Sequence, residues 1–255
     1  MILLLGGTSE TAGLAEALAA ADLQVLVSTV TDLSLNTGSH PAIERVTGEL
    51  DAPALERTVR KRAIKAIVDA TNPYALQAHE TARRVADKLG LPYFKWTREE
   101  TRYDASAVDI ADDHEHAAKL AASYGRAVLL TTGSKHLPMY VESCRIRGVP
   151  LVARVLPEPQ STEACRAAGI QPDRIVTGRG PFSVEENVSL LTKFDIGVLV
   201  TKDGGPAGGT PEKLQAARQC GCRVVMIRRP AEERDAEFSE VELLVRAVCD
   251  ALGAS

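Results

Sequence analysis

Short apolar runs recur along the whole chain, and each is followed by glycine or polar residues and then by a stretch with helical character. Continuous apolar runs bounded in this way are typical of strands buried on both faces of a parallel sheet. The pattern predicts about five strands in each half of the chain. Their expected positions are Ile2–Leu5, Leu23–Thr29, Arg45–Gly48, Lys65–Asp69, Leu91–Lys95, Ala127–Thr131, Pro150–Leu156, Arg174–Val176, Ile196–Val200 and Arg223–Ile227.

This alternation of strands and helices predicts an α/β fold with two doubly wound, Rossmann-like parallel-sheet domains and an interdomain cleft between their strand ends. In the chain of 255 residues, we expect residues 1–96 to form the first domain and residues 126–255 the second. The stretch 97–125 is charged and mixed in character, so we interpret it as a crossover segment between the domains.

Residues that favour helix ends support the same alternation. Asp51 is the expected N-cap of one helix, and Pro73 is expected to begin another that ends near Gly90. Caps are also expected at later helices, at Ser183 with Glu186, at Thr210 before Pro211, and at Ser239 with Glu242.

The composition is that of an ordinary globular protein. Hydrophobic residues make up 45% of the chain, and the net charge of −4 argues against a nucleic-acid partner. No stretch approaches the length of a membrane span, and Met1–Leu5 lacks the features of a signal peptide. The five cysteines show no repeated metal-ligand spacing, and Cys220-Gly221-Cys222 is interpreted as a turn into a strand. We therefore expect a cytoplasmic protein with no metal site and no membrane partner, and the sequence leaves the oligomeric state open.

The N-terminal stretch Met1–Ala17, MILLLGGTSETAGLAEA, predicts a strand, a tight glycine turn and a helix N-terminus. This combination favours binding of a phosphate group, because glycine lets the backbone approach closely and the helix dipole attracts negative charge. We expect Gly7, Thr8, Ser9 and Glu10 to hold the pyrophosphate of a dinucleotide. A plain strand-to-helix turn that binds nothing is the alternative, since the glycine spacing is not G-x-G-x-x-G.

The end of the second predicted strand bears on the choice of nucleotide. Many dinucleotide-binding domains carry a carboxylate there, which holds the adenosine ribose hydroxyls. This chain has Ser28 and Thr29 instead, and its first carboxylate follows at Asp32. Hydroxyls do not repel a ribose 2′-phosphate, so the pattern favours NADP over NAD, unless both residues merely end the strand. Gly48, which turns the chain after the third strand, is included in this predicted cofactor site.

In doubly wound order, the first and fourth predicted strands of the N-terminal half lie side by side. The loop that begins at Asp69 would then border the glycine loop, and the nicotinamide end of a dinucleotide would lie near Thr71, Asn72 and Tyr74. Asn72 can equally be an ordinary cap of the following helix. Tyr74 can stack on a ring or lie on the surface.

Two histidines, His114 and His116, lie in the acidic run DIADDHEH. A pair with this spacing can bind a metal ion, but no further ligand cluster appears elsewhere in the chain. A solvated helix start is the favoured interpretation.

The loop Thr201–Pro211, TKDGGPAGGTP, is the most unusual part of the second half. A glycine-rich backbone with a lysine after a buried strand favours a site for anionic groups, with a long surface loop as the alternative. Other glycine-containing loops with basic residues are expected at the same edge of the sheet. The predicted substrate-binding residues are Thr132, Gly133, Lys135, Arg179, Lys202, Gly204 and Gly205. Together they predict a large substrate with several negative charges.

Several segments resemble the precorrin-6A reductases of the cobalamin pathway. They are GGTSETAGLA near the N-terminus, VDATNPYA at Val68–Ala75, TTG at Thr131–Gly133, VTKDGGPAGGTPEKLQAA at Val200–Ala217, and a late RRP. The segments span nearly the whole chain in the family's order. One departure is Asn72, where many members are expected to carry histidine.

The resemblance implies NADPH-dependent reduction of one ring double bond of precorrin-6A, giving precorrin-6B. The substrate is then a small-molecule anionic tetrapyrrole, with residues 1–96 as the NADP-binding domain and 126–255 on the substrate side. The nicotinamide would deliver a hydride to a ring carbon, and an acid or water would protonate the adjacent carbon. Tyr74 and Asp203 are the candidate catalytic residues for this proton.

Two other functions fit parts of the sequence. A tetrapyrrole methyltransferase that uses S-adenosylmethionine also carries glycine-rich loops. A non-catalytic NADP-binding regulator would use the first domain but would leave the second glycine-rich loop without a role.

Overall fold

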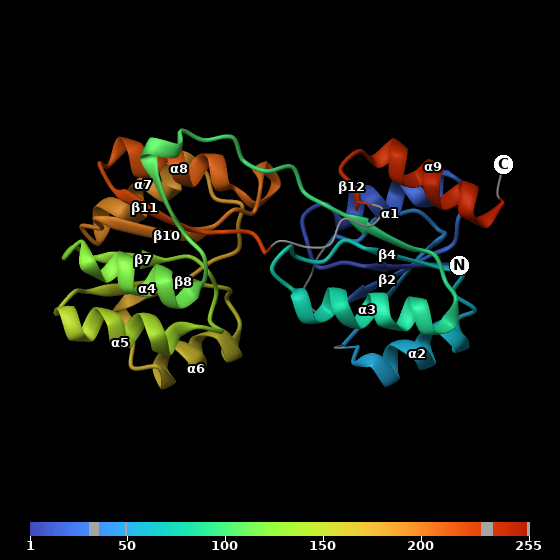
Figure 1. Cartoon of the computed structure of the whole chain (residues 1–255), viewed down its shortest axis with the longest axis horizontal. Helices are drawn as coiled ribbons and strands as arrows, with labels where there is room; N and C mark the ends of the chain where they lie inside the picture. The colour runs from blue at the N-terminus through green and yellow to red at the C-terminus, as the bar shows by residue number, and fades with distance from the viewer. Residues whose placement is uncertain (31–35, 49, 231–236, 254–255) are drawn as a thin grey trace. The chain divides into compact units, whose positions relative to one another are not determined.

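The structure is a computed structural model of the chain, and it describes residues 1–30, 36–48, 50–230 and 237–253. The chain divides into two compact units. Unit 1 comprises Met1–Glu99 and Pro230–Ser255, and unit 2 comprises Glu100–Arg229. In Figure 1 the C-terminal helix, drawn in red, lies in the same unit as the blue N-terminal elements.

Unit 1 is built on a six-stranded sheet in which every pair of neighbouring strands is parallel. The strands in spatial order are β12 (Glu237–Phe238), β5 (Tyr93–Trp96), β4 (Ala66–Asp69), β1 (Ile2–Leu5), β2 (Val25–Thr29) and β3 (Ile43–Thr47). The order reverses at β1, which pairs with β2 on one side and β4 on the other. The carboxyl ends of β1 and β4 therefore form the switch point at which ligands bind in such sheets.

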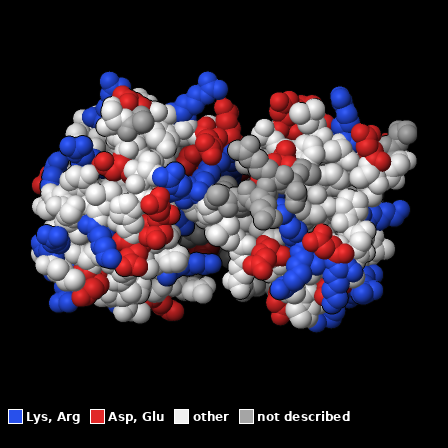
Figure 2. Space-filling view, in the orientation of Figure 1, with Lys and Arg blue, Asp and Glu red and all other residues white. Residues whose placement is uncertain are grey.

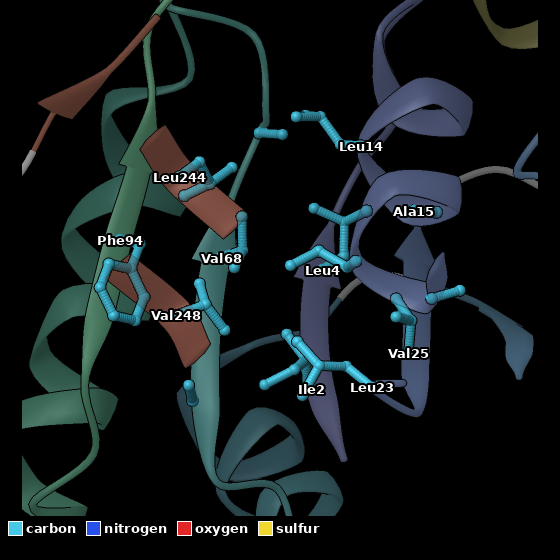
Figure 3. Close-up of a cluster of buried hydrophobic side chains, with 14 of the residues drawn as sticks. Ile2, Leu4, Leu14, Ala15, Leu23, Val25, Val68, Phe94, Leu244 and Val248 are labelled. Atoms are coloured by element: carbon cyan, nitrogen blue, oxygen red, sulfur yellow. The ribbon is translucent and has the colours of Figure 1, made fainter. Parts of the chain in front are cut away.

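Helices cover both faces of this sheet. One face carries α1 (Thr11–Ala20) and α9 (Val241–Leu252), and the other carries α2 (Ala52–Lys61) and α3 (Leu76–Leu89). Figure 3 shows Leu244 and Val248 of α9 beside Val68 of β4 and Phe94 of β5. Both α9 side chains are fully buried, so the last helix completes the core that the first strand begins.

Unit 2 contains a second six-stranded sheet, again with parallel neighbours throughout. Its spatial order is β6 (Val108–Ala111), β11 (Arg223–Ile227), β10 (Val198–Lys202), β7 (Val128–Leu130), β8 (Leu151–Val155) and β9 (Ile175–Thr177). One face of the sheet carries α7 (Val184–Lys193) and α8 (Thr210–Gln219). The other carries α4 (His114–Ser123), α5 (Leu137–Arg147) and α6 (Pro159–Ala167). Short 3₁₀ turns lie at Ala105–Ala107, Pro172–Arg174 and Pro206–Gly208. The switch point of this sheet lies between β7 and β10.

The predicted fold class is confirmed, because both units are α/β with doubly wound parallel sheets. Every predicted strand is present, with ends within about two residues of the expected positions. The predicted adjacency of the first and fourth strands is also confirmed, since Leu5 of β1 lies opposite Asp69 of β4.

The expected domain limits differ from the structure in two places. The segment 97–125 is not a plain crossover, because most of it belongs to unit 2, where it supplies the edge strand β6 and helix α4. The segment from Pro230 onward belongs to unit 1 instead of the second domain. Both missed strands, β6 and β12, lie at sheet edges, where polar residues interrupt the apolar pattern of a buried strand.

The helix caps were predicted with mixed success. Asp51 accepts a hydrogen bond from the Ala54 amide at 2.8 Å, and Ser183 forms the expected capping box. The helix predicted from Pro73 begins instead at Leu76, after a turn, and ends as expected before Gly90. The predicted caps at Thr210 and at Ser239 were wrong. The N-cap residues there are Gly209 and Glu240.

No helix formed by the described residues is both long enough and apolar enough to cross a membrane.

Candidate functional site

The glycine loop after β1 is shaped by a threonine that the sequence analysis missed. The Oγ1 atom of Thr11 accepts hydrogen bonds from the amides of Gly7 and Thr8, each at 3.1 Å. A Cβ at Gly6 would come within 2.5 Å of the Thr11 side chain, and Gly7 has a φ of +112°, so both positions favour glycine. The loop therefore wraps closely around the first turn of α1. A phosphate at these amides would have to share them with the Thr11 hydroxyl.

An ion pair lies beside this loop. The Arg98 guanidinium lies 2.5 Å from the Glu10 carboxylate, and the Arg98 side chain is 9% exposed. Glu10 was predicted to hold a pyrophosphate, yet a carboxylate alone would repel one. Arg98 neutralises it and brings a buried cation close to the start of α1.

At the end of β2, the predicted hydroxyl residues are present, and a cation joins them. Ser28 and Thr29 are buried, and the Arg45 guanidinium of β3 donates to the Thr29 hydroxyl from Nε at 3.2 Å and from Nη2 at 3.1 Å. Gly48 donates its amide to the Thr29 carbonyl oxygen at 3.0 Å. Asp32 lies outside the described residues. Arg45 is the kind of residue that accommodates a ribose 2′-phosphate at this position.

Asp69, at the end of β4, is fully buried and organises the next loop. Its Oδ1 accepts from the amide of Thr71 at 3.0 Å and from the Thr71 hydroxyl at 2.7 Å, while its Oδ2 accepts from His79 and from the Tyr93 hydroxyl, each at 2.7 Å. Burial by itself raises the pKa of Asp69, but the bonds from His79, Tyr93 and Thr71 outweigh it and lower the pKa to about 2. Burial, followed by the charge of Asp69, raises the pKa of Tyr93.

His79 faces an acceptor at each ring nitrogen. Its Nδ1 lies against the Asp69 carboxylate, and its Nε2 lies 3.1 Å from the Asn72 carbonyl oxygen. The Thr71 hydroxyl also lies 3.1 Å from Nδ1, so His79 is held on both sides of its ring. Asp69 and His79 thus form a buried ion pair that fixes the loop, and Asp69 is placed to position other residues more than to touch a ligand.

Asn72 shapes the rest of this loop by accepting two backbone hydrogen bonds. Its Oδ1 accepts from the Tyr74 amide at 3.0 Å, and its carbonyl accepts from the Ala75 amide at 2.8 Å, which closes a turn before α3. Asn72 is exposed and Tyr74 is half-buried. The hydroxyl of Thr8 donates to the carbonyl of Ala70 at 3.2 Å, so the two predicted cofactor loops are in contact.

In unit 2, Asp203 is buried and held by several donors. Its Oδ1 accepts from the Thr101 hydroxyl at 2.7 Å and from the Gly205 amide at 3.0 Å, while its Oδ2 accepts from the Thr101 amide at 3.2 Å and lies 3.4 Å from Arg229. Both oxygens of the carboxyl group are thus occupied by donors from the protein itself. The geometry therefore favours a positioning role for Asp203 in the loop after β10 over the predicted role as a proton donor.

The same loop uses glycine where a side chain would not fit well. Gly205 has a φ of +68°, and the Gly204 amide donates to the Thr210 hydroxyl at 3.0 Å. A Cβ on Gly209 would approach Pro181 at 3.2 Å, so the loops after β9 and β10 touch. Arg179 is exposed in the former loop.

Basic side chains gather at the carboxyl edge of this sheet. Lys202 ends β10, and burial followed by the neighbouring charge of Lys135 lowers the pKa of Lys202 to about 8. Lys135, Thr132 and Gly133 follow β7, which pairs with β10. The structure thus brings Lys135 and Lys202 together, as predicted. Two histidines, His114 and His136, join them and were not assigned a binding role from the sequence.

A buried arginine and a half-buried lysine were missed on the other face of the sheet. The Arg154 guanidinium of β8 lies 4.1 Å from the centre of the Phe182 ring, and burial lowers the pKa of Arg154 to about 10. Lys213 of α8 donates to the Gly208 carbonyl at 3.2 Å, and burial followed by the charge of Arg154 lowers the pKa of Lys213 to about 8. Neither residue follows a strand in sequence, so only the fold could place them near this edge.

Elsewhere on the visible face of each unit, Figure 2 shows acidic and basic side chains interspersed. Among the described residues, no group of three or more His, Cys, Asp or Glu side chains is arranged to hold a metal ion.

The chain is similar to known proteins over nearly its whole length. Residues 1–249 match the family described as Precorrin-6x reductase CbiJ/CobK. The chain is 32% identical over 249 residues to the cobalt-precorrin-6A reductase of Priestia megaterium, covering 97% of this chain and 98% of the relative. It is 33% identical over 238 residues to the precorrin-6A reductase of Rhodococcus erythropolis, covering 90% and 89%.

A solved structure described as CobK precorrin-6A reductase shares the fold. Its TM-score is 0.80 at 24% sequence identity, and the match covers 98% of this chain and 96% of that one. The sequence motifs, the two doubly wound sheets and the match over residues 1–249 lead to one assignment. The chain belongs to the precorrin-6x reductase family of cobalamin biosynthesis.

Proposed function

We propose that this protein catalyses the NADPH-dependent reduction of one ring double bond of precorrin-6A, or of its cobalt complex, to give the corresponding precorrin-6B. Family membership supports the reaction, because both relatives carry reductase names of this kind. The observation that carries the proposal is the pair of switch-point edges. One has a glycine loop and an arginine suited to a phosphorylated nucleotide, and the other is rich in lysine and suited to a carboxylate-fringed ring.

Unit 1 is proposed to bind the dinucleotide. Gly7, Thr8, Ser9 and Glu10 would border the pyrophosphate, at a turn where Gly7 is exposed and has a positive φ. Arg98 would supply the positive charge that Glu10 lacks. Ser28 and Thr29, with Gly48 beside them, would meet the adenosine ribose.

The preference for NADPH follows from Arg45. Its guanidinium already bonds the Thr29 hydroxyl through two nitrogens, so it is held at the end of β2. A guanidinium recognises phosphate oxygens through paired hydrogen bonds, and no carboxylate among the described residues at the end of β2 opposes it.

NADPH, when bound, supplies the hydride. The protein's own contribution is then mainly to position the two reactants. Thr71, Asn72 and Tyr74 are proposed to border the nicotinamide, in a loop that the Asp69–His79 ion pair holds in shape. Tyr74 stays a candidate for the proton delivered to the carbon next to the reduced one, whereas Asp203 is better suited to holding its loop.

Unit 2 is proposed to bind the tetrapyrrole. Lys202 and Lys135, with Thr132, Gly133, Gly204 and Gly205 around them, form a basic edge that suits acetate and propionate groups. Arg179 is exposed in the loop after β9 and can reach carboxylates at the rim.

Calorimetric titration of NADPH, NADH and S-adenosylmethionine tests the proposal against its alternatives. We expect tight binding of NADPH only. Binding of S-adenosylmethionine would instead indicate a methyltransferase, which the family match does not favour. Loss of nicotinamide absorbance on addition of precorrin-6A or cobalt-precorrin-6A then separates a reductase from a non-catalytic regulator, and comparing the two substrates shows which one is used.

A further inference from the structure

A cavity of about 580 Å³ lies at the amino edge of the sheet in unit 2, which is the edge where its strands begin. Its lining residues lie just before four neighbouring strands, β10, β7, β8 and β9, so the parallel sheet brings together segments that are far apart in the sequence. The volume is in the range of small-molecule sites. Lys202 ends β10 at the opposite edge of the same sheet, so the cavity is separate from the proposed tetrapyrrole site.

Charged side chains of both signs line this cavity. The cations are Arg126 before β7, Arg174 before β9 and Lys193 at the end of α7, and the carboxylates are Asp173 before β9 and Asp195 before β10. Arg174 is half-buried and the other four are exposed. A molecule in the cavity therefore meets both positive and negative groups.

The opposite charges around the cavity are not paired with one another. Among the described residues, no ion pair joins one of the three cations to either carboxylate. The Arg126 guanidinium donates to the Gly221 carbonyl oxygen at 3.4 Å, and the Lys193 ammonium lies 5.2 Å from the centre of the Phe194 ring. A molecule that carries one charge of each sign can therefore pair with both kinds of group.

The wall of the cavity also has an apolar part and a helix end. Phe194, Ala127 and Pro150 contribute apolar surface. Phe194 is the C-cap residue of α7, and the C-terminal end of a helix carries partial negative charge. This helix end favours an ammonium group on the side of Asp195, which is the next residue in the chain.

We propose that the cavity at the amino edge of unit 2 binds a zwitterionic small molecule of the size of a short peptide. Its ammonium group pairs with Asp195, its carboxylate pairs with Arg126 and Arg174, and an apolar side chain packs against Phe194. The inference does not rest on the proposed function, because the cavity shares no residue with the proposed cofactor and substrate sites.

The spacing of the strands agrees with a molecule of this length. β10 and β9 are three strand spacings apart, or roughly 14 Å, and an extended dipeptide spans roughly 7 Å. The long side chains of Arg126 and Arg174 can cover the remaining distance to a carboxylate whose ammonium group lies at Asp195.

NMR titration of the full chain at pH 6.5 with three related peptides tests the proposal. Leucyl-phenylalanine carries both charges at this pH, N-acetyl-leucyl-phenylalanine carries only the carboxylate, and leucyl-phenylalanine amide carries only the ammonium group. The backbone amide signals of Gly125 and Phe194 report on the cavity. We expect saturable shifts of both signals, with leucyl-phenylalanine binding roughly fivefold more tightly than either singly charged peptide.

Two outcomes of this titration would overturn the proposal. Equal affinity for the three peptides would contradict recognition of a zwitterion. The absence of saturable shifts at Gly125 and Phe194 would contradict the site itself.

Variants assign each charge of the peptide to its partner. Asp195→Asn removes the carboxylate at a position with a φ of +48°, which asparagine tolerates. It should lower the affinity for leucyl-phenylalanine to that of the N-acetyl form, without weakening the N-acetyl form. The double variant Arg126→Gln/Arg174→Gln should lower the affinity for leucyl-phenylalanine to that of the amide form, without weakening the amide form.

Glu115→Gln and Arg145→Gln are the matched controls, because each removes the same kind of charge from an exposed helix position of unit 2 outside the cavity. Both should leave all three affinities within about twofold. A cavity variant that weakens the three peptides equally would contradict the assignment of the charges.

Discussion

At the scale of single residues, histidine has different roles in this protein according to the atoms that surround its ring. His79 lies between the Asp69 carboxylate and the Asn72 carbonyl oxygen, so it holds the loop after β4 in shape. His114 lies beside the hydroxyl of Tyr140, and burial followed by the charge of Lys202 lowers the pKa of His114 to about 3. Neither environment follows from the local sequence, because the decisive partners, Asp69 and Tyr140, come from other elements.

The contact between Asp69 and His79 makes the free energy of unfolding depend on pH. The pKa of Asp69 is lowered in the folded chain from 3.8 to about 2, so its stabilising effect is complete above pH 4 and is lost as the pH falls toward 2. We expect this titration to remove about 2 kcal/mol from the free energy of unfolding. Urea unfolding between pH 5 and pH 2 measures it.

Removing the charge of Asp69 by substitution at neutral pH should lower the free energy of unfolding further. In Asp69→Asn, the buried groups of His79, Tyr93 and Thr71 lose their charged acceptor, and we expect a loss of about 3 kcal/mol in the free energy of unfolding. Glu56→Gln is the control, because it breaks the Lys88–Glu56 pair at the surface and should cost under ~1 kcal/mol. Equal effects of the two substitutions would contradict a buried ion pair.

Arg45 is expected to decide between the two nicotinamide dinucleotides. Arg45→Ala should weaken NADPH binding by about 2 kcal/mol, or roughly 30-fold, and leave NADH binding nearly unchanged, because only NADPH carries the 2′-phosphate. Ser28→Asp should act in the same direction by repulsion. Calorimetric titration of both dinucleotides measures the ratio, with Arg60→Ala, at an exposed position of α2, as the control. If neither variant changes the ratio of the NADPH and NADH dissociation constants, the assignment of the ribose site is wrong.

At the scale of elements, the buried strands were predictable and the edges were not. A strand such as β1 is apolar throughout because both its faces are covered, so the sequence reveals it directly. The edge strand β6 contains Asp109, and β12 has only two residues, so neither stands out from a loop. The same limit applies to the site. Loops that follow buried strands were found, whereas Arg154 within β8 gains its role from a tertiary contact with Phe182. Thr11 within α1 was missed although its contacts with Gly7 and Thr8 are local in sequence.

Helix α9 shows what a missed pairing means for stability. Leu244 is fully buried against the sheet of unit 1, while its neighbour Leu243 is 45% exposed. Leu244→Ala should lower the free energy of unfolding by about 3 kcal/mol, because it leaves a cavity in the core. Leu243→Ala should change it by under ~1 kcal/mol. Hydrogen exchange of the amides in β4 and β5 measures the local effect, and equal losses in both variants would mean that α9 does not pack as described.

At the scale of the whole molecule, the two units divide the proposed work. Each repeats the same architecture, a parallel sheet with a switch point, but the residues at the two edges differ in chemistry. The glycine loop of unit 1 suits a phosphate, and the lysine-rich edge of unit 2 suits carboxylates. The same proposal arises from the sequence alone, because Gly6 and Gly7 follow β1 directly and Lys202 ends β10. The domain limits could not be predicted from the sequence, because the chain leaves unit 1 after Glu99 and returns to it at Pro230.

This division predicts a selective effect of Lys202→Ala. Loss of the cation should weaken tetrapyrrole binding by roughly tenfold or more, while the dissociation constant of NADPH stays within about twofold. Steady-state kinetics with each reactant varied in turn, together with NADPH titration, measures both. A similar loss for both reactants would argue against separate binding roles for the two units.

The return of the chain to unit 1 also bears on its synthesis. Residues 1–99 leave the ribosome well before Val241–Leu252 is synthesised. The sheet of unit 1 therefore emerges without α9, which covers part of one of its faces. Unit 2 is continuous in sequence and can fold as soon as it has left the exit tunnel. We therefore expect unit 2 to fold before unit 1 is complete, with Leu4 and Val68 left partly uncovered until α9 has been synthesised.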